Sequence, residues 1–281
     1  MSNILEIEDL SFRYPDSPKR AVSGFGLSIP EGEIVVLAGP SGCGKSTLLR
    51  AVNGLIPHMY SGDYSGEVRV DGVAVKDASM RDLAQKVGFL FQNPENQIFM
   101  FTVERDVAFG LENLGVPRPE MRARVDEAMG LLEIGSLAPR APHELSDGQK
   151  QRVALAGVLA MRPRLVILDE PTSLLDPKTA SELVGLVARL RDDLGTTFLI
   201  VEHRLDLLVR VADRMVLMNE GKKVVEGTPE EVLFGDEAEG YGVAVPSVTR
   251  LQKMLIRDGA LRPEGLLAPE ELARRVGGVR E

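Results

Sequence analysis

A glycine-rich stretch stands at residues 39–47 and reads Gly39-Pro40-Ser41-Gly42-Cys43-Gly44-Lys45-Ser46-Thr47. It follows the apolar run 34–38 and precedes residues 48–51, which are typical of a helix. This order of strand, glycine loop and helix is the context in which G-x-x-x-x-G-K-[ST] binds phosphate. Glycines let successive backbone N–H groups point into one concavity, and the helix start adds its positive end. The stretch therefore predicts a nucleoside triphosphate site, in which Lys45 reaches the β- and γ-phosphates and the Ser46 hydroxyl binds Mg²⁺.

Composition limits the class of protein. A chain of 281 residues, 44% of them hydrophobic, is long enough for one large α/β domain with an appendage. The formal net charge of −9 argues against a surface that grips nucleic acid through its phosphates. Cys43 is the single cysteine, so no internal disulfide can form, which fits a reducing compartment. Apolar runs such as residues 153–161 fall short of the roughly 20 residues that cross a bilayer, so we expect any membrane association to pass through a partner.

Short apolar runs alternate with helical patterns along the chain. The runs typical of strands buried on both faces of a parallel sheet are 34–38, 87–91, 165–168 and 196–201. Further strands and hairpins are predicted at 4–14, 26–29, 66–75 and 214–226. Apolar residues recur at helical spacing in 102–114, 119–132, 149–161 and 177–190, and again near the end in 248–257 and 269–276. The first three of these patterns predict a helical insertion between two halves of the sheet.

Two acids follow the apolar run 165–168. A carboxylate at a strand tip beside the phosphate loop can hold Mg²⁺ through water, and we assign this role to Asp169. Glu170 would act as general base toward the attacking water. Taken alone, the pair is equally consistent with an exposed acidic turn after a buried strand.

Three more polar positions have the same relation to predicted elements. Gln92 ends the run 87–91, where an amide can contact both Mg²⁺ and water. His203 follows the run 196–202, where an imidazole can hydrogen-bond a γ-phosphate or the attacking water. Ser146 precedes the helix predicted near 149–161, and its hydroxyl with the first amides of that helix would meet a phosphate.

Taken in this order, the motifs resemble those of the ATPase subunits of ABC transporters, over about residues 4–233. The matching elements are Walker A (39–47), the Q-loop (Gln92), the signature (145–149), Walker B (165–170), the D-loop (173–176) and His203. The resemblance implies an α/β fold: a P-loop NTPase, RecA-like core with a mainly parallel sheet, an N-terminal antiparallel β part, an inserted helical subdomain at about residues 93–163 and a short C-terminal helical extension. It places the ATPase domain at residues 1–234 and the extension at 235–281.

The resemblance also implies ATP and Mg²⁺ as cofactors. The implied nucleotide contacts are Tyr14 under the adenine ring, Gly39, Pro40, Ser41, Gly42, Cys43, Gly44, Lys45, Ser46 and Thr47 around the phosphates, and Ser146, Gly148 and Gln149. The implied metal contacts are Ser46, Gln92 and Asp169, and the implied catalytic residues are Glu170, His203 and Gln92. In this family the signature completes the ATP site of an opposing subunit. We therefore expect a dimer, either of two copies or with a paralogous ATPase.

Two segments narrow the resemblance. Residues 91–113 and 150–160 look like those of energy-coupling factor ATPases, which energise uptake of vitamins or of nickel and cobalt. This implies ATP-driven dimer closure at the cytoplasmic face of the membrane, with a membrane scaffold subunit and a substrate-binding membrane subunit as partners. Two alternatives stay open: the ATPase of another ABC transporter, and a soluble ABC ATPase of DNA repair or translation. The single cassette, the lack of a coiled-coil insertion and the acidic balance disfavour the latter, so no nucleic-acid partner is expected.

One position departs from the family pattern, because Asp147 stands where the signature usually has glycine. A carboxylate near a transferred phosphoryl group is repulsive unless it points away or pairs with a cation. We therefore expect either a slower composite site or an Asp147 side chain that turns outward.

Overall fold

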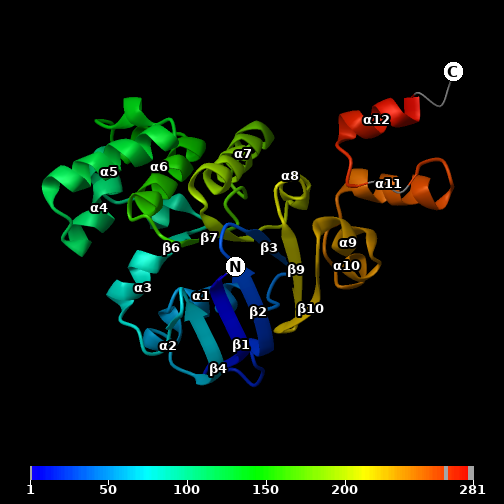
Figure 1. Ribbon diagram of the computed structural model, residues 1–281, viewed down its shortest axis with the longest axis horizontal. Coiled ribbons are helices and arrows are strands. Elements are labelled where there is room, and N and C mark those ends of the chain that lie inside the picture. Colours follow the sequence, from blue (N-terminus) through cyan, green and yellow to red (C-terminus); the bar gives the residue numbers. More distant parts are fainter. Residues whose placement is uncertain (1, 263–264, 278–281) are drawn as a thin grey trace.

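In a computed structural model, the chain folds into two β-sheets with helices packed around them (Figure 1). The structure describes residues 2–262 and 265–277. One sheet is antiparallel, in the order β2-β1-β4-β5, and its strands are β1 (Asn3–Arg13), β2 (Val22–Pro30), β4 (Asp63–Val70) and β5 (Val73–Ala74). The other has the order β10-β9-β3-β8-β7-β6. Its parallel strands are β3 (Ile34–Ala38), β6 (Val87–Leu90), β7 (Leu165–Asp169), β8 (Thr197–Val201) and β9 (Arg214–Asn219), and β10 (Lys222–Gly227) pairs antiparallel with β9. The predicted combination of a mainly parallel sheet with an antiparallel N-terminal part is confirmed.

Strand β3 lies in the middle of the parallel sheet and is buried on both faces. Its alternate side chains point to opposite sides, as in any strand. Ile34, Val36 and Ala38 face a core shared with the surrounding helices. Val35 and Leu37 face a second core shared with helix α1 (Lys45–Val52) and the antiparallel sheet. Because no residue of β3 is more than 1% exposed, the loop that follows it grows out of a fixed base.

Three helices inserted between β6 and β7 form a cluster at one end of the molecule, drawn in green in Figure 1. They are α4 (Val103–Leu114), α5 (Arg118–Leu131) and α6 (Asp147–Ala160), and we call them the helical cluster. Thr102 caps α4, and Gly115 ends it with a left-handed φ of 75°. The predicted helix at 149–161 begins two residues earlier in the structure, because Ser146 caps its first turn.

Further helices cover the sheet or lie beyond it. Helix α7 (Pro177–Leu194) follows β7, and the short helices are α2 (Leu55–His58), α3 (Met80–Lys86) and α8 (Leu205–Leu208). The C-terminal part consists of α9 (Pro229–Phe234), α10 (Glu237–Gly240), α11 (Ser247–Arg257) and α12 (Pro269–Gly277). The sequence did not predict α2, α3 and α8–α10, because helices this short carry too few apolar repeats; α3 buries only Leu83.

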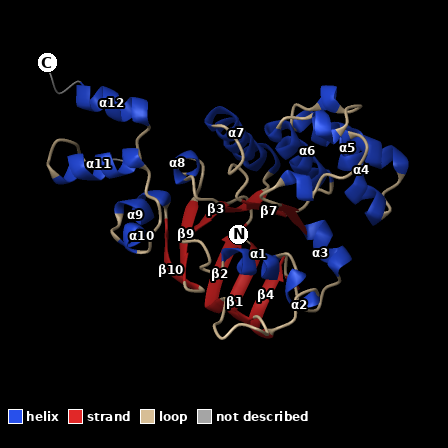
Figure 2. Cartoon of the chain, turned by 180° about the vertical axis from the view of Figure 1, so that it is seen from behind, coloured by secondary structure: helices blue, strands red, loops and turns tan. Residues whose placement is uncertain are grey.

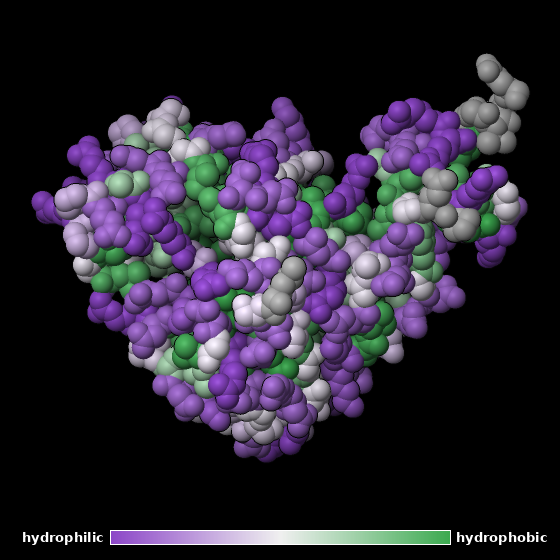
Figure 3. All heavy atoms as spheres, viewed as in Figure 1, coloured by the Kyte–Doolittle hydropathy of each residue, from purple (hydrophilic) through white to green (hydrophobic). Residues whose placement is uncertain are grey.

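The C-terminal helices lie at the opposite end from the helical cluster (Figure 2). Hydrophilic side chains dominate the face of the molecule that Figure 3 shows, and apolar side chains are visible between the C-terminal helices. Val243, Val245, Ala268 and Leu272 are buried there. The division at residue 234 coincides with the end of α9 and stays a prediction; residues 263–264 and 278–281 of the predicted extension lie outside the described residues. No helix in the described part of the chain is long and apolar enough to cross a membrane.

Candidate functional site

Two glycines fix the loop between β3 and α1. Gly39 and Gly44 have φ angles of 153° and 112°, a backbone conformation that residues with a side chain rarely adopt. A Cβ at Gly39 would collide with the backbone oxygen of Met218, and one at Gly44 with the backbone oxygen of Ala21. Only glycine fits at either position, so the predicted glycine requirement has a steric cause.

The lysine of this loop is folded into it. Lys45 is 6% exposed, and its Nζ donates to the backbone oxygens of Gly39 at 2.8 Å and Pro40 at 3.1 Å. Helix α1 begins at Lys45. The first N–H groups of any helix lack intrahelical partners, and no side chain caps those of α1. Ser46 is exposed at the same helix start. A buried ammonium and unpaired amides around one concavity suit an anion with several oxygens.

One carboxylate joins the ends of three neighbouring strands, β6, β7 and β8. Glu170 follows β7, and its Oε2 accepts a hydrogen bond of 2.8 Å from Nε2 of Gln92, which follows β6. Its Oε1 lies 3.2 Å from Nε2 of His203, which follows β8. The backbone of Glu170 has a φ of 48°, and its N–H donates to the oxygen of Val201 at 2.8 Å. The structure thus brings together the three residues for which the sequence predicts catalytic roles.

Asp169 lies at the last position of β7, next to this group. Burial raises the pKa of its carboxyl group, and the negative charge of Glu170 raises it further, while Lys45, Arg50 and His203 act in the opposite direction. An ionised Asp169 is therefore poorly compensated in the chain alone, and a cation at the site would stabilise it.

The donor set fits a divalent ion only with help from the nucleotide. Across residues 2–262 and 265–277 no group of three or more histidine, cysteine or acidic side chains is arranged to hold a metal. Mg²⁺ in proteins commonly keeps waters and is bound by one or two protein oxygens together with substrate phosphates. Asp169, the exposed Ser46 and the Gln92 amide supply the kind of oxygens that such a site requires.

The strand order sets the width of the site. Strand β8 lies between β3, which carries the phosphate loop, and β7, which carries Asp169 and Glu170. Neighbouring strands are about 4.8 Å apart, so the two carboxyl ends stand roughly 10 Å apart with His203 between them. A cavity of about 210 Å³ opens here, lined by residues 39–41, by Glu202 and His203, and by residues 242–244 from the C-terminal part. The sequence did not indicate that the C-terminal part would reach the phosphate loop.

Glu202 is a residue of this site that the sequence reasoning missed. It is 2% exposed, and its Oε1 accepts from the backbone N–H groups of His203 at 2.7 Å and Arg204 at 3.1 Å. Its Oε2 accepts from the N–H and the hydroxyl of Thr172, at 3.2 and 2.5 Å. Glu202 therefore ties the loop after β8 to the loop after β7 and fixes the backbone of His203. The sequence feature that could have indicated Glu202 is an acidic residue directly after the apolar run 196–201.

Tyr14 lies beside α1 on the other side of the phosphate loop. Its hydroxyl is 3.3 Å from the Thr47 hydroxyl and accepts from Nη1 of Arg50 at 2.9 Å. Its ring is edge-on to the ring of Phe12, 4.9 Å away, and to that of Tyr60, 6.4 Å away. Tyr60, which the sequence reasoning did not single out, is therefore a second aromatic side chain near this loop.

The signature residues lie elsewhere, at the start of α6. Ser146 Oγ accepts from the N–H of Gln149, and Gln149 Oε1 accepts from the N–H of Ser146, which forms a capping box. Gly148 packs against α7: a Cβ there would lie 2.5 Å from Cγ2 of Thr179. Helices α1 and α6 stand apart in both views (Figures 1 and 2). The site around Lys45 and the signature are therefore two separate places on one chain.

Residues 22–173 match the family model described as ABC transporter. The chain belongs to this family. It is an ATP-binding and ATP-hydrolysing protein, an ABC ATPase. The ABC ATPase is 41% identical to an ABC transporter ATP-binding protein of Pyrococcus abyssi, over 98% of each chain. It is also 41% identical to the energy-coupling factor transporter ATP-binding protein EcfA1 of Lacticaseibacillus paracasei, over 97% of this chain and 96% of that protein.

Two solved structures resemble this ABC ATPase. That of cbiO1 from Clostridium perfringens, described as part of the ABC transporter complex cbiONQ, matches with a TM-score of 0.77 and 35% identity, covering 90% of this chain and 100% of that one. A dimeric ATP-binding cassette in a post-hydrolysis state, bound to ADP and Pi, matches with a TM-score of 0.69 and 29% identity, covering 80% of this chain and 98% of that one. Both are ATP-binding domains, so the P-loop NTPase fold of the ABC ATPase is confirmed.

The unusual signature residue of this ABC ATPase has a cationic neighbour. The Asp147 side chain is exposed, and its Oδ1 lies 3.8 Å from Nζ of Lys150. The same Nζ is 2.5 Å from Oε1 of Glu95, in the turn after Gln92. This contact lowers the pKa of the Glu95 carboxyl group and raises that of Lys150. Asp147 thus has a cation beside it, whereas both expectations for its effect on the composite site stay predictions. Lys150 connects the signature helix to the Gln92 loop.

Proposed function

We propose that this ABC ATPase is the energising subunit of a membrane importer of the energy-coupling factor type, which takes up a vitamin or nickel or cobalt. The observation that carries the hydrolytic part is the convergence of Gln92 and His203 on Glu170, whose strand β7 is separated from β3 and its phosphate loop only by β8. The similarity to EcfA1 and to cbiO1 supports the class of transporter.

In the proposed mechanism the loop at residues 39–47 binds the phosphates of ATP, and Lys45 exchanges its bonds to backbone oxygens for bonds to phosphate oxygens. Ser46, Gln92 and Asp169 would hold Mg²⁺, whose charge offsets that of the β- and γ-phosphate oxygens. Tyr14 would contact the adenine ring, beside the exposed side chain of Tyr60, to which its own ring is edge-on.

Glu170 would accept a proton as water attacks the γ-phosphorus and the bond to ADP breaks. Gln92 and His203 hold the two oxygens of this carboxylate from either side, so its orientation is set before ATP arrives. His203 also has its backbone fixed by Glu202, which leaves the imidazole free to turn from Glu170 toward the γ-phosphate.

We propose that Ser146, Gly148 and Gln149 contact ATP bound to a second subunit, which is another copy or a paralogue. The separation of the signature from the chain's own phosphate loop supports this arrangement. Dimerisation in the similar post-hydrolysis structure supports it as well.

The surface next to Gln92 supports a contact with membrane subunits, a scaffold and a substrate-binding protein, at the cytoplasmic face of the membrane. Phe99 and Phe101 are 62% and 84% exposed there. Asp106, which is 7% exposed, accepts from the backbone N–H groups of Phe99 and Met100, both at 3.0 Å, and so fixes the loop that presents these rings. Exposed aromatic side chains on a fixed loop are typical of protein interfaces.

The test is co-purification of the tagged chain from detergent-solubilised native membranes. We expect a multi-span scaffold and a small substrate-binding membrane protein to accompany the wild-type chain. Phe101→Glu should lose both partners and keep ATP binding, whereas the control Met59→Glu, at an exposed position (71%) away from this loop, should keep them. Recovery with an importer that uses a separate soluble binding protein would favour another ABC transporter. Recovery alone, with ribosomes or with DNA, would contradict the transport function.

A further inference from the structure

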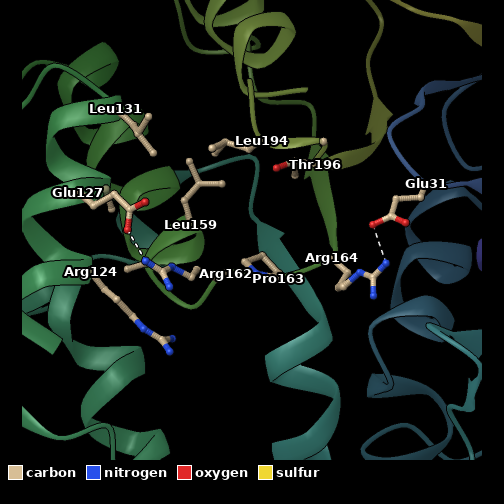
Figure 4. A pocket seen from close by; sticks show the side chains of 13 residues that line it. Glu31, Arg124, Glu127, Leu131, Leu159, Arg162, Pro163, Arg164, Leu194 and Thr196 are labelled. Atoms are coloured by element: carbon tan, nitrogen blue, oxygen red, sulfur yellow. Dashed lines mark hydrogen bonds and ion pairs between the residues drawn. The ribbon is translucent and has the colours of Figure 1, made fainter. Parts of the chain in front are cut away.

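A cavity of about 290 Å³ lies between the helical cluster and the sheet, at the end of the strands opposite to the phosphate loop (Figure 4). One wall comes from α5 and α6, and the other from the starts of β7 and β8 and the turn before β3. The phosphate loop leaves β3 at its carboxyl end, whereas this cavity borders the amino ends of the neighbouring parallel strands. Strands of five residues are roughly 16 Å long, so the cavity is distinct from the ATP site.

The lining of the cavity is divided by polarity. Figure 4 shows Leu131, Leu159 and Leu194 together on one side of the space. The guanidinium groups of Arg124, Arg162 and Arg164 lie on the other side. Glu31 and Glu127 line the cavity as well, so its three arginines leave one net positive charge. With the apolar side, this makes the cavity complementary to a molecule with an anionic head and a short apolar body.

The arginines have unused donors. The Nη2 atom of each arginine donates to a carboxylate: Arg124 to Glu120 at 2.5 Å, Arg162 to Glu127 at 2.6 Å, and Arg164 to Glu31 at 2.5 Å. Arg164 also has its Nη1 3.3 Å from Oδ1 of Asp71. A guanidinium carries five N–H donors in a planar fork, so each of the three groups keeps at least two more.

One of these donors lacks any partner. Nε of Arg124 is buried and makes no hydrogen bond within residues 2–262 and 265–277. A buried N–H group without an acceptor is unfavourable, and because this one is shielded from the cavity, an anion there would accept from it only after the Arg124 side chain turns. This orphaned donor is the feature that a merely structural cluster of ion pairs does not explain.

We propose that this cavity binds a small amphipathic anion, a carboxylate or a phosphate monoester, with its head on the arginines and its apolar part against the leucines. The volume is at the lower end of the range of about 300–1,000 Å³ found for ligand pockets, which restricts the ligand to a small metabolite. A ligand held there touches the helical cluster and the sheet together, so it stabilises the chain against unfolding and leaves the phosphate loop accessible.

The test uses the full chain with Mg²⁺ and a saturating non-hydrolysable ATP analogue, so that the phosphate loop cannot bind the probe. Phenyl phosphate and hexanoate are the anionic probes, and phenol and 1-hexanol are their neutral counterparts. We expect saturable binding of one anionic probe by ligand-observed NMR, a rise of the melting temperature with its concentration, and no saturable binding of either neutral probe. The probe that binds identifies the head group as phosphate or carboxylate.

Variants assign the binding to the cavity. Arg124→Gln combined with Arg162→Gln should weaken it at least tenfold, and Leu194→Asp, which places a negative charge at a half-exposed position of the rim, should do the same. Arg189→Gln, at an exposed arginine outside the cavity, should leave it unchanged. If the double variant does not fold, Leu194→Asp decides the outcome. Absence of saturable binding, or equal binding by the wild type and Leu194→Asp, would overturn the proposal.

Discussion

Replacing the buried Glu202 with glutamine should destabilise the loop that carries His203. Both carboxylate oxygens accept two hydrogen bonds, at Oε1 from the N–H groups of His203 and Arg204 and at Oε2 from Thr172. Glutamine keeps only one oxygen, so whichever way its amide turns, two donors face an NH₂ group instead of an acceptor.

The size of the effect follows from these bonds. A hydrogen bond to a charged group contributes about 1.5–3 kcal/mol, and if glutamine turns its oxygen toward His203 and Arg204, the Thr172 hydroxyl can rotate to accept from the new NH₂. We therefore expect Glu202→Gln to lower the free energy of unfolding by about 2–3 kcal/mol, which corresponds to a melting temperature lower by roughly 4–10 °C. Glu202→Ala removes both acceptor oxygens and all four hydrogen bonds and should cost more, about 4 kcal/mol.

Urea unfolding of the ATP-free chain measures the stability, and steady-state ATP hydrolysis measures the effect on the site. Once its backbone is released, the imidazole of His203 should leave its position 3.2 Å from Glu170, and turnover should fall at least tenfold. The Michaelis constant for ATP should change little, because the Glu202 carboxylate accepts from Thr172, His203 and Arg204, whereas Lys45 donates to Gly39 and Pro40. The exposed Glu8, changed to glutamine, is the matched control. A Glu202→Gln chain within 0.5 kcal/mol of the wild type and with normal turnover would refute the positioning role.

Three further substitutions test the site. Glu170→Gln should keep ATP binding and reduce turnover at least 100-fold if this carboxylate accepts the proton; single-turnover hydrolysis at wild-type rate would contradict the assignment. Gly39→Ala should weaken ATP binding and lower the free energy of unfolding by about 1–3 kcal/mol, because its Cβ meets the Met218 oxygen; calorimetric titration and urea unfolding measure the two effects, and unchanged values would contradict the loop geometry. Asp169→Asn should stabilise the ATP-free chain at pH 7. The pKa of the Asp169 carboxyl group is raised above 3.8 in the folded chain, so folding favours the protonated acid. The stability of the wild type therefore falls as the pH rises from the unfolded to the folded pKa. Equal melting temperatures of the two chains from pH 4 to 8 would contradict the burial effect.

Much of the site was predictable because its residues directly follow strands that the sequence marks clearly. Gln92, Glu170 and His203 each come within two residues of a buried apolar run, and parallel strands bring their carboxyl ends to one edge. The sequence therefore indicates that these side chains are near one another. It does not indicate that a single carboxylate holds the other two, because this depends on the order β8-β7-β6, which is set by long-range pairing.

The remaining features depend on contacts between distant segments. Glu202 looks like the end of a strand until the loop at Thr172 is known to lie against it. Lys150 and Glu95 are far apart in sequence, and neither position has a local pattern that predicts their contact. The order of the N-terminal strands is equally non-local, because β1 pairs with both β2 and β4.

Because the C-terminal part lies beside the phosphate loop, a fluorescent side chain placed there would report on nucleotide binding. Residues 242–244 line the same cavity as residues 39–41, and the sequence contains no tryptophan. Tyr241→Trp would introduce the single indole of the protein directly beside that cavity, with no background emission from other indoles. Its fluorescence would follow nucleotide arrival and departure in real time, in the purified chain and in the assembled complex alike, without a label attached to Cys43.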